Sequence, residues 1–202
     1  MKAQKKPICT IGLIVINVAY FLYLSFGGRT EDGMYMLEQG AAFTPFIVAY
    51  KEYYRLFTAM FLHFGETHLM NNMLTLGVVG TNLEPVVGKV RFLLIYLLSG
   101  LGGNLLSVWY DMQTADYAIS AGASGAVFGL TGALLAMTII GRGRVGTVTR
   151  QGMLFMILFS LYLGFTGSGV NNFAHIGGLL TGLIITFLVG PRKRHRERST
   201  FS

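Results

Sequence analysis

The sequence has few charged residues. Only 12% of its 202 residues are Asp, Glu, Lys or Arg, which is about half the share found in a soluble domain. Such a chain cannot cover a surface that faces water, and 52% of its residues are hydrophobic. The composition therefore excludes a disordered chain and an ordinary soluble domain, and it predicts that a lipid bilayer is the solvent.

Cysteine is almost absent. The single Cys9 lies inside an apolar run, which excludes an internal disulfide and a cluster of thiolate metal ligands.

The net charge of +7 is compatible with nucleic-acid binding, but the basic residues gather in the two tails and two short loops. Membrane topology explains this distribution better, and we expect no nucleic-acid partner.

Long stretches without charge indicate spanning helices, each of which needs about 20 mainly apolar residues. The stretches are 8–26, 67–83, 92–110, 117–140 and 151–191. The last is long enough for two crossings, with a turn at 167–172. The sequence thus predicts an all-α membrane protein with six transmembrane helices. The first stretch could instead be a signal peptide, but its length and the lack of a cleavage site favour an anchor.

The connection between the first two predicted spans, residues 27–65, is too long and too apolar for a plain linker. Its aromatic segments, 43–50 and 53–64, are too short to cross a bilayer. We expect them to form a membrane-embedded loop at the interface, where Tyr and Phe side chains are stable.

Basic residues divide unequally between the two predicted sides of the membrane. With a cytoplasmic N-terminus, 13 of the 16 Lys and Arg residues lie inside, and only Arg29, Lys51 and Arg55 lie outside. The positive-inside rule then places both termini in the cytoplasm, as six spans require. The expected organisation is an N-tail over 1–7, a six-span domain over 8–191 and a basic C-tail over 192–202.

Polar side chains inside the predicted spans are few, and each is costly in lipid. His68 and Asn72 lie one helical turn apart in the second span, Ser124 begins the fourth, and His175 lies near the start of the sixth. These three spans run in the same direction. The four side chains therefore share one depth, near the outer ends of the helices.

Small residues predict which of these helices touch. Gly125, Gly129 and Ala133 recur every four residues in the fourth span, as Gly178 and Gly182 do in the sixth, a pattern that allows close helix packing in lipid. If the two stripes face each other, a serine nucleophile and a histidine base lie side by side. The plainer alternative is that the serine caps its helix and the histidine satisfies a carbonyl group.

Three motifs carry a resemblance to a known family. Residues 122–125 (GASG), 174–178 (AHIGG) and 68–72 (HLMNN) resemble the motifs of the rhomboid family of intramembrane serine proteases. The similarity extends over nearly the whole chain and includes Tyr54-Arg55, where the family often has Trp-Arg, and Glu84 with Gly88. It implies a rhomboid-like six-helix bundle.

The resemblance also implies the chemistry of the site. Ser124 is the expected nucleophile and His175 its general base, with His68, Asn72 and the backbone N–H of Ser124 forming the oxyanion hole. Phe128 replaces a tyrosine of some members and could stack on the histidine ring. The motif residues expected to support the site are Gly122, Gly125, Phe128 and Gly178. Substrates would be transmembrane helices, with no cofactor and no metal.

Three alternatives were weighed against this hypothesis. A zinc protease is disfavoured because His63 and His68 are five residues apart and so lie on different helix faces. A catalytically inactive relative that binds membrane clients is expected to lack the serine or the histidine. A transporter is disfavoured because the polar groups cluster at one end of the spans.

We expect a protein of the bacterial plasma membrane with its active site toward the outside.

Overall fold

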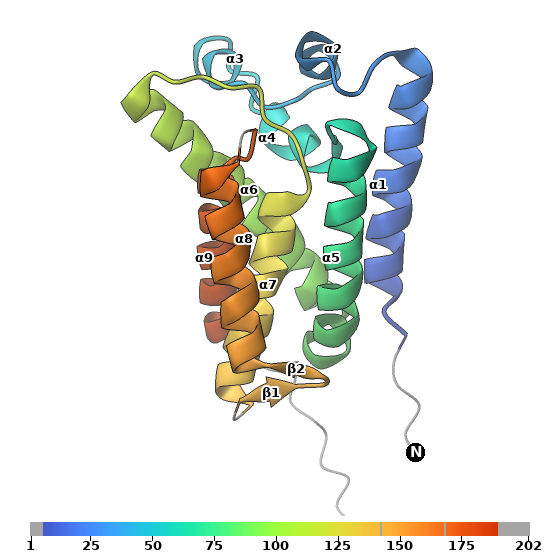
Figure 1. Cartoon of the computed structure of the whole chain (residues 1–202), viewed down its shortest axis with the longest axis vertical. Helices are drawn as coiled ribbons and strands as arrows, with labels where there is room; N and C mark the ends of the chain where they lie inside the picture. The colour runs from blue at the N-terminus through green and yellow to red at the C-terminus, as the bar shows by residue number, and fades with distance from the viewer. Residues whose placement is uncertain (1–5, 142, 168, 190–202) are drawn as a thin grey trace, which may run out of the picture.

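The computed structural model describes residues 6–141, 143–167 and 169–189. Six long helices form a bundle along the vertical axis of Figure 1, with α6 crossing it at a tilt. They are α1 (Ile8–Gly27), α5 (Gly65–Val87), α6 (Lys89–Thr114), α7 (Ser124–Ile140), α8 (Arg150–Thr166) and α9 (Asn172–Val189). Residues 1–5 of the predicted N-tail and the whole predicted C-tail, 192–202, lie outside the described residues.

The six long helices coincide with the six predicted segments. Among the described residues, α1, α6 and α9 are each long and apolar enough to cross a membrane, and α7 is a shorter apolar helix. The prediction of an all-α integral membrane protein is confirmed. The charge-free stretch that marks the fourth span begins at Tyr117, and α7 begins at Ser124, the residue expected to begin that span.

Short helices fill the connection between α1 and α5. They are α2 (Gly33–Glu38), α3 (Thr44–Ala49), α4 (Arg55–Thr58) and the 3₁₀ helix η1 (Ala59–Phe61). In Figure 1 α2 and α3 lie above one end of the bundle, which we call the loop end. At the opposite end, β1 (Arg144–Val145) and β2 (Val148–Thr149) form a small antiparallel hairpin between α7 and α8. We call this the hairpin end.

Arg55 holds the α1–α5 connection together. Its side chain is buried and donates through Nη1 to the carbonyl oxygens of Leu37, at 2.6 Å, and Ala41, at 3.0 Å. Its Nε pairs with Glu52 at 2.5 Å. Its guanidinium carbon lies 5.2 Å from the centroid of the Phe46 ring and 5.3 Å from that of the Tyr54 ring. Since a buried charge is stable only when it is paired and hydrogen-bonded, these contacts fix the path of the loop.

Glycine-on-glycine contacts bring α7 and α9 together. A Cβ atom added at Gly178 would overlap the carbonyl oxygen of Gly125, and one added at Gly182 would overlap that of Gly129. The backbones approach this closely only because these residues have no side chain. The prediction that the two small-residue stripes face each other is confirmed.

α8 is packed less tightly than its neighbours. Only Met153, Ile157 and Gly164 are buried on it, whereas Phe155 and Leu158 are 70% and 66% exposed. In a membrane protein such large exposed apolar side chains face lipid. α7, by contrast, is buried along almost its whole length and forms the centre of the bundle.

Glu84 of α5 joins that helix to the start of α1. The buried carboxylate accepts hydrogen bonds from the backbone N–H of Cys9 at 3.0 Å, and from the N–H and hydroxyl of Thr10, both at 2.8 Å. The first N–H groups of a helix have no partner within the helix. No side chain of α1 itself caps them in this structure, so Glu84 serves as the cap from another helix.

Replacing Glu84 with alanine is expected to destabilise the fold by about 2–5 kcal/mol, because it leaves three buried donors without an acceptor. Glu84→Gln retains one acceptor oxygen and should cost less. The measurement is the unfolding free energy in detergent micelles. The control is Glu66→Ala, an exposed carboxylate at the start of the same helix, for which we expect a loss below about 1 kcal/mol. Equal losses for Glu84→Ala and Glu66→Ala would contradict the capping role.

Candidate active site

A polar cavity of about 980 Å³ opens near the loop end of the bundle. Its lining includes all four of the side chains expected to carry the chemistry and three of the four supporting residues. They are His68, Asn72, Gly122, Ser124, Gly125, Phe128 and His175. The fourth supporting residue, Gly178, is not part of the lining. It packs α9 against α7 below the cavity.

Ser124 is the first residue of α7. The N-cap position is occupied by Ala123, and no side chain caps this helix among the described residues. The alternative that Ser124 is a structural helix cap is therefore wrong. Its hydroxyl is partly exposed to the cavity, and it lies at the positive end of the helix dipole, where a developing negative charge is stabilised.

His175 lies in the first turn of α9 and faces the same cavity. Its side chain is buried, and its Nδ1 has no hydrogen-bond partner among the described residues. The Phe128 ring stacks on the imidazole with 4.2 Å between ring centroids and 9° between planes. This confirms the expected stack, which fixes the plane of the imidazole without using either ring nitrogen.

The chain segments next to Ser124 and His175 touch each other. A methyl group on Gly125 would lie 3.3 Å from the carbonyl oxygen of Ala174, so the residue after the serine contacts the residue before the histidine. The structure contains no direct hydrogen bond between the two side chains within its described residues. Catalytic hydrogen bonds are often long before substrate binds, so this spacing is compatible with a nucleophile and its base.

Gly122 lies between the serine and His68. A Cβ atom on this residue would lie 2.9 Å from His68 Nε2 and 3.5 Å from the Ser124 hydroxyl oxygen, and its φ of 143° is unfavourable for other residues. Glycine is thus required here both for backbone conformation and for space. Asn72 donates through Nδ2 to the His68 carbonyl oxygen at 3.0 Å, which leaves its second amide N–H for another acceptor.

The segment 115–123, which leads into Ser124, is not helical and is held by contacts with distant residues. Ser120 and Ala42 exchange two backbone hydrogen bonds of 2.8 Å, which tie this segment to the α1–α5 connection. The N–H of Ala123 donates to His63 Nε2 at 3.4 Å. Burial lowers the pKa of His63 to about 3, so the imidazole is neutral near pH 7 and can accept this bond. These contacts explain why the charge-free stretch that begins at Tyr117 is not helical before Ser124.

Asn171 is a positioning residue that the sequence did not reveal, because it stood out only as a polar residue at the turn before the sixth span. Its Nδ2 donates to the hydroxyls of Ser107, at 2.7 Å, and Ser120, at 2.9 Å, and its Oδ1 accepts from the N–H of Ala174 at 3.0 Å. One side chain thus connects α6, the segment before α7 and the start of α9. An asparagine three residues before a first-turn N–H is a typical N-cap, and this signal was present in the sequence.

With alanine at position 171, we expect the segment before α7 to open more often. Loss of the cap and of the two hydroxyl contacts costs about 1–2 kcal/mol, which should speed amide hydrogen exchange at Ser120 and Gly122 about 5- to 30-fold. Ser107→Ala removes one of the contacts and should have a smaller effect. Unchanged exchange in the Asn171 variant would show that this segment is held by its backbone bonds alone.

The structure and the site define a class: a helical membrane protein in which a serine and a histidine from two closely packed helices face one polar cavity. Residues 50–192 match the rhomboid domain, which is more than half of the chain. The protein belongs to the rhomboid family.

Its relatives include proteins named as proteases. It is 35% identical over 188 residues to rhomboid protease GluP of Bacillus subtilis, covering 93% of this chain and 36% of GluP. It is 36% identical over 149 residues to the candidate rhomboid protease YdcA of the same organism, covering 74% of this chain and 73% of YdcA. With RHOMBOID-like protein 1 of Arabidopsis thaliana it shares 38% identity over 162 residues, covering 77% of this chain and 40% of the relative. The chain thus spans only part of the length of these relatives.

Proposed function

We propose that this protein is an intramembrane serine endopeptidase that cleaves transmembrane-helix substrates. The observation that carries the proposal is the placement of Ser124 and His175 on one polar cavity within a membrane-embedded bundle. The glycine-packed contact between α7 and α9 supports it, because it brings these two residues together. Retention of both residues favours an active enzyme over an inactive client-binding relative.

The proposed reaction begins with proton transfer. His175 accepts the proton of the Ser124 hydroxyl while the serine oxygen attacks the carbonyl carbon of the scissile peptide bond. The tetrahedral intermediate collapses when His175 returns the proton to the amine of the leaving peptide. A water molecule, activated by the same histidine, then hydrolyses the acyl-enzyme and regenerates the serine.

The oxyanion of the tetrahedral intermediate needs hydrogen-bond donors. We assign this role to the backbone N–H of Ser124, the His68 ring and the free amide N–H of Asn72, all of which line the cavity. The uncapped start of α7 adds a favourable dipole. Phe128 supplies no hydroxyl, so its contribution is to hold the His175 ring in plane.

The orientation in the membrane is part of the proposal. The bias of 13 basic residues to one side predicts that the hairpin end and both tails are cytoplasmic and that the cavity opens toward the outer face. Substrate helices would be cut near that face, after local unwinding, because a peptide bond in a helix is not accessible to a nucleophile.

A fluorophosphonate probe tests the function directly. We expect the purified protein to cleave a model transmembrane substrate in liposomes and to form a covalent adduct on Ser124, located by mass spectrometry. A structural serine would not react, because only a serine with an adjacent base is nucleophilic at neutral pH. Intact substrate together with an unlabelled Ser124 would refute the proposal.

Removal of single oxyanion donors should slow the reaction without preventing it. For His68→Ala and Asn72→Ala we expect kcat to fall by about 10²–10³, with a smaller change in KM. Asn82→Ala is a matched control for Asn72→Ala. Asn82 also donates to the carbonyl oxygen four residues earlier on α5, that of Val78, at 2.9 Å. Unlike Asn72, it lies near the hairpin end. Equal kcat values for Asn72→Ala and Asn82→Ala would remove Asn72 from the oxyanion hole.

A further inference from the structure

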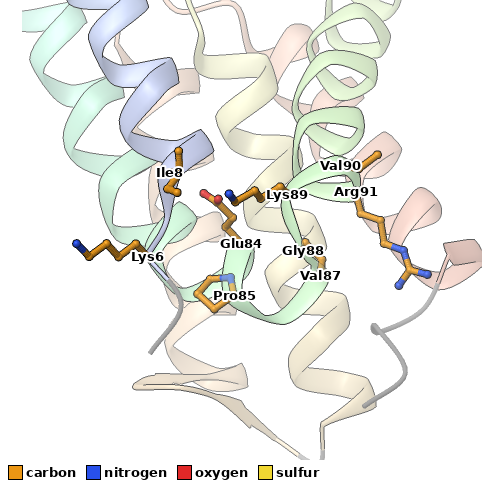
Figure 2. A pocket seen from close by; sticks show the side chains of 9 residues that line it. All are labelled: Lys6, Ile8, Glu84, Pro85, Val87, Gly88, Lys89, Val90 and Arg91. Atoms are coloured by element: carbon orange, nitrogen blue, oxygen red, sulfur yellow. The ribbon is translucent and has the colours of Figure 1, made fainter. Parts of the chain in front are cut away.

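A second cavity, of about 640 Å³, lies at the hairpin end of the bundle, far from the site described above. It is formed by the start of α1, the end of α5 and the start of α6 (Figure 2). The lining residues are Lys6, Ile8, Glu84, Pro85, Val87, Gly88, Lys89, Val90 and Arg91. The proposed proteolytic chemistry assigns no role to this cavity.

The charges that line this cavity are mainly positive. Its lining contains three basic residues, Lys6, Lys89 and Arg91, and a single carboxylate, that of Glu84. Figure 2 shows the Lys89 ammonium group directed toward Glu84, while Lys6 and Arg91 extend to opposite sides of the cavity. One carboxylate can balance only one of the three basic side chains, and its oxygens already accept three hydrogen bonds from α1. The lining therefore favours an anion.

Apolar side chains border the same cavity. Ile8 is 54% exposed and Val90 is 72% exposed, and both belong to helices long and apolar enough to cross a membrane. A soluble anion would gain nothing from these side chains. A molecule with a phosphate group and hydrocarbon chains would contact both the basic and the apolar parts of the lining.

We propose that this cavity binds the phosphate headgroup of an anionic membrane phospholipid, with Lys89 and Lys6 as the principal cationic contacts. The acyl chains would lie along the exposed apolar side chains of α1 and α6. A lipid bound here would bridge these two helices at the point where Glu84 also joins α1 to α5. The proposal depends on the membrane location of the bundle and is independent of the proposed protease activity.

The test measures lipid retention by the purified full chain. The protein is released for native mass spectrometry from detergent that contains equal amounts of phosphatidylglycerol and phosphatidylcholine. We expect it to retain phosphatidylglycerol preferentially. Lys89→Gln and Lys6→Gln should each weaken that retention about fivefold, as expected for the loss of one basic contact. Lys6→Gln changes an exposed residue and should leave folding intact, so it keeps the test valid if Lys89→Gln folds poorly.

Arg29→Gln is the matched control, because it removes one positive charge from an exposed residue after α1, at the loop end. We expect it to retain phosphatidylglycerol like the unaltered protein. Equal retention by Lys6→Gln, Lys89→Gln and Arg29→Gln would overturn the proposal, since binding would then reflect net charge alone. Displacement of the lipid by millimolar inorganic phosphate would also overturn it, because the site would then bind soluble phosphate rather than a lipid.

Discussion

With alanine in place of Ser124, we expect cleavage of a transmembrane substrate to fall by at least about 10⁴-fold, because a serine nucleophile and its base act as a unit. His175→Ala should cause a loss of similar size. The double variant should be no slower than either single variant, since removing one partner already disables the other. The measurement is the initial rate of product formation in liposomes at saturating substrate.

The control for this experiment is Ser25→Ala. Ser25 also lies in a long helix, α1, but its hydroxyl donates to the Phe21 carbonyl oxygen at 2.8 Å and it does not line the cavity. We expect this variant to cleave at the unaltered rate. Unfolding temperatures of all variants should agree within a few degrees. Wild-type rates for Ser124→Ala or His175→Ala would show that the assigned dyad is wrong.

Valine at position 178 is expected to disrupt the contact between α7 and α9. A Cβ atom at Gly178 already overlaps the carbonyl oxygen of Gly125, and backbone atoms cannot move aside as the end of a flexible side chain can. Overpacking of this kind costs about 3 kcal/mol or more. We therefore expect a lower unfolding temperature in detergent and loss of cleavage, because His175 lies only three residues before this contact.

Glycine-to-alanine changes give this prediction its control. Gly12 of α1 has no atom within 4 Å of the position that a Cβ would occupy, so Gly12→Ala should be tolerated and should stabilise the helix by about 0.5–1 kcal/mol. Gly178→Ala, which adds the same atom, should destabilise the protein. If Gly178→Ala and Gly12→Ala unfold at the same temperature, α9 can move away from α7 at little cost, and the glycine contact does not fix the site.

The Ser124→Ala and Gly178→Val substitutions act on different levels of the structure. Ser124→Ala removes the reacting atom and should leave the fold intact. Gly178→Val retains every reacting group but should change the distance between α7 and α9, which carry them. A comparison of unfolding temperature with cleavage rate separates the two. We expect low activity with normal stability in the first variant, and low activity with reduced stability in the second.

The proposed lipid site at the hairpin end would link the membrane to this arrangement. Lys89 begins α6, and α6 also carries Ser107, which contacts Asn171 near the active site. A lipid that stabilises the hairpin end of α6 would therefore act on the same helix that supports the start of α9. Lipid retention and cleavage can be measured on the same variants, Lys6→Gln and Arg29→Gln, to separate binding from catalysis.

Much of the fold could be predicted because its signals are local. Charge-free stretches of sufficient length indicated six helices, and four-residue spacing of glycines indicated which two pack closely, as the Gly178 contact with Gly125 confirms. The site residues could be proposed for a related reason. Polar side chains are so costly in lipid that His68, Ser124 and His175 stand out within otherwise apolar segments.

The sequence by itself determined the membrane class, the number of long helices and the residue types available for chemistry, because these depend on composition and short-range periodicity. Only the tertiary structure decided what holds the segment before α7, what Glu84 binds and what Asn171 connects. Each of these depends on contacts between residues about 50 to 80 positions apart, and local patterns carry no information about such pairs. Ser124 lines the cavity at the start of α7, and this placement depends on the distant partners that hold the preceding segment.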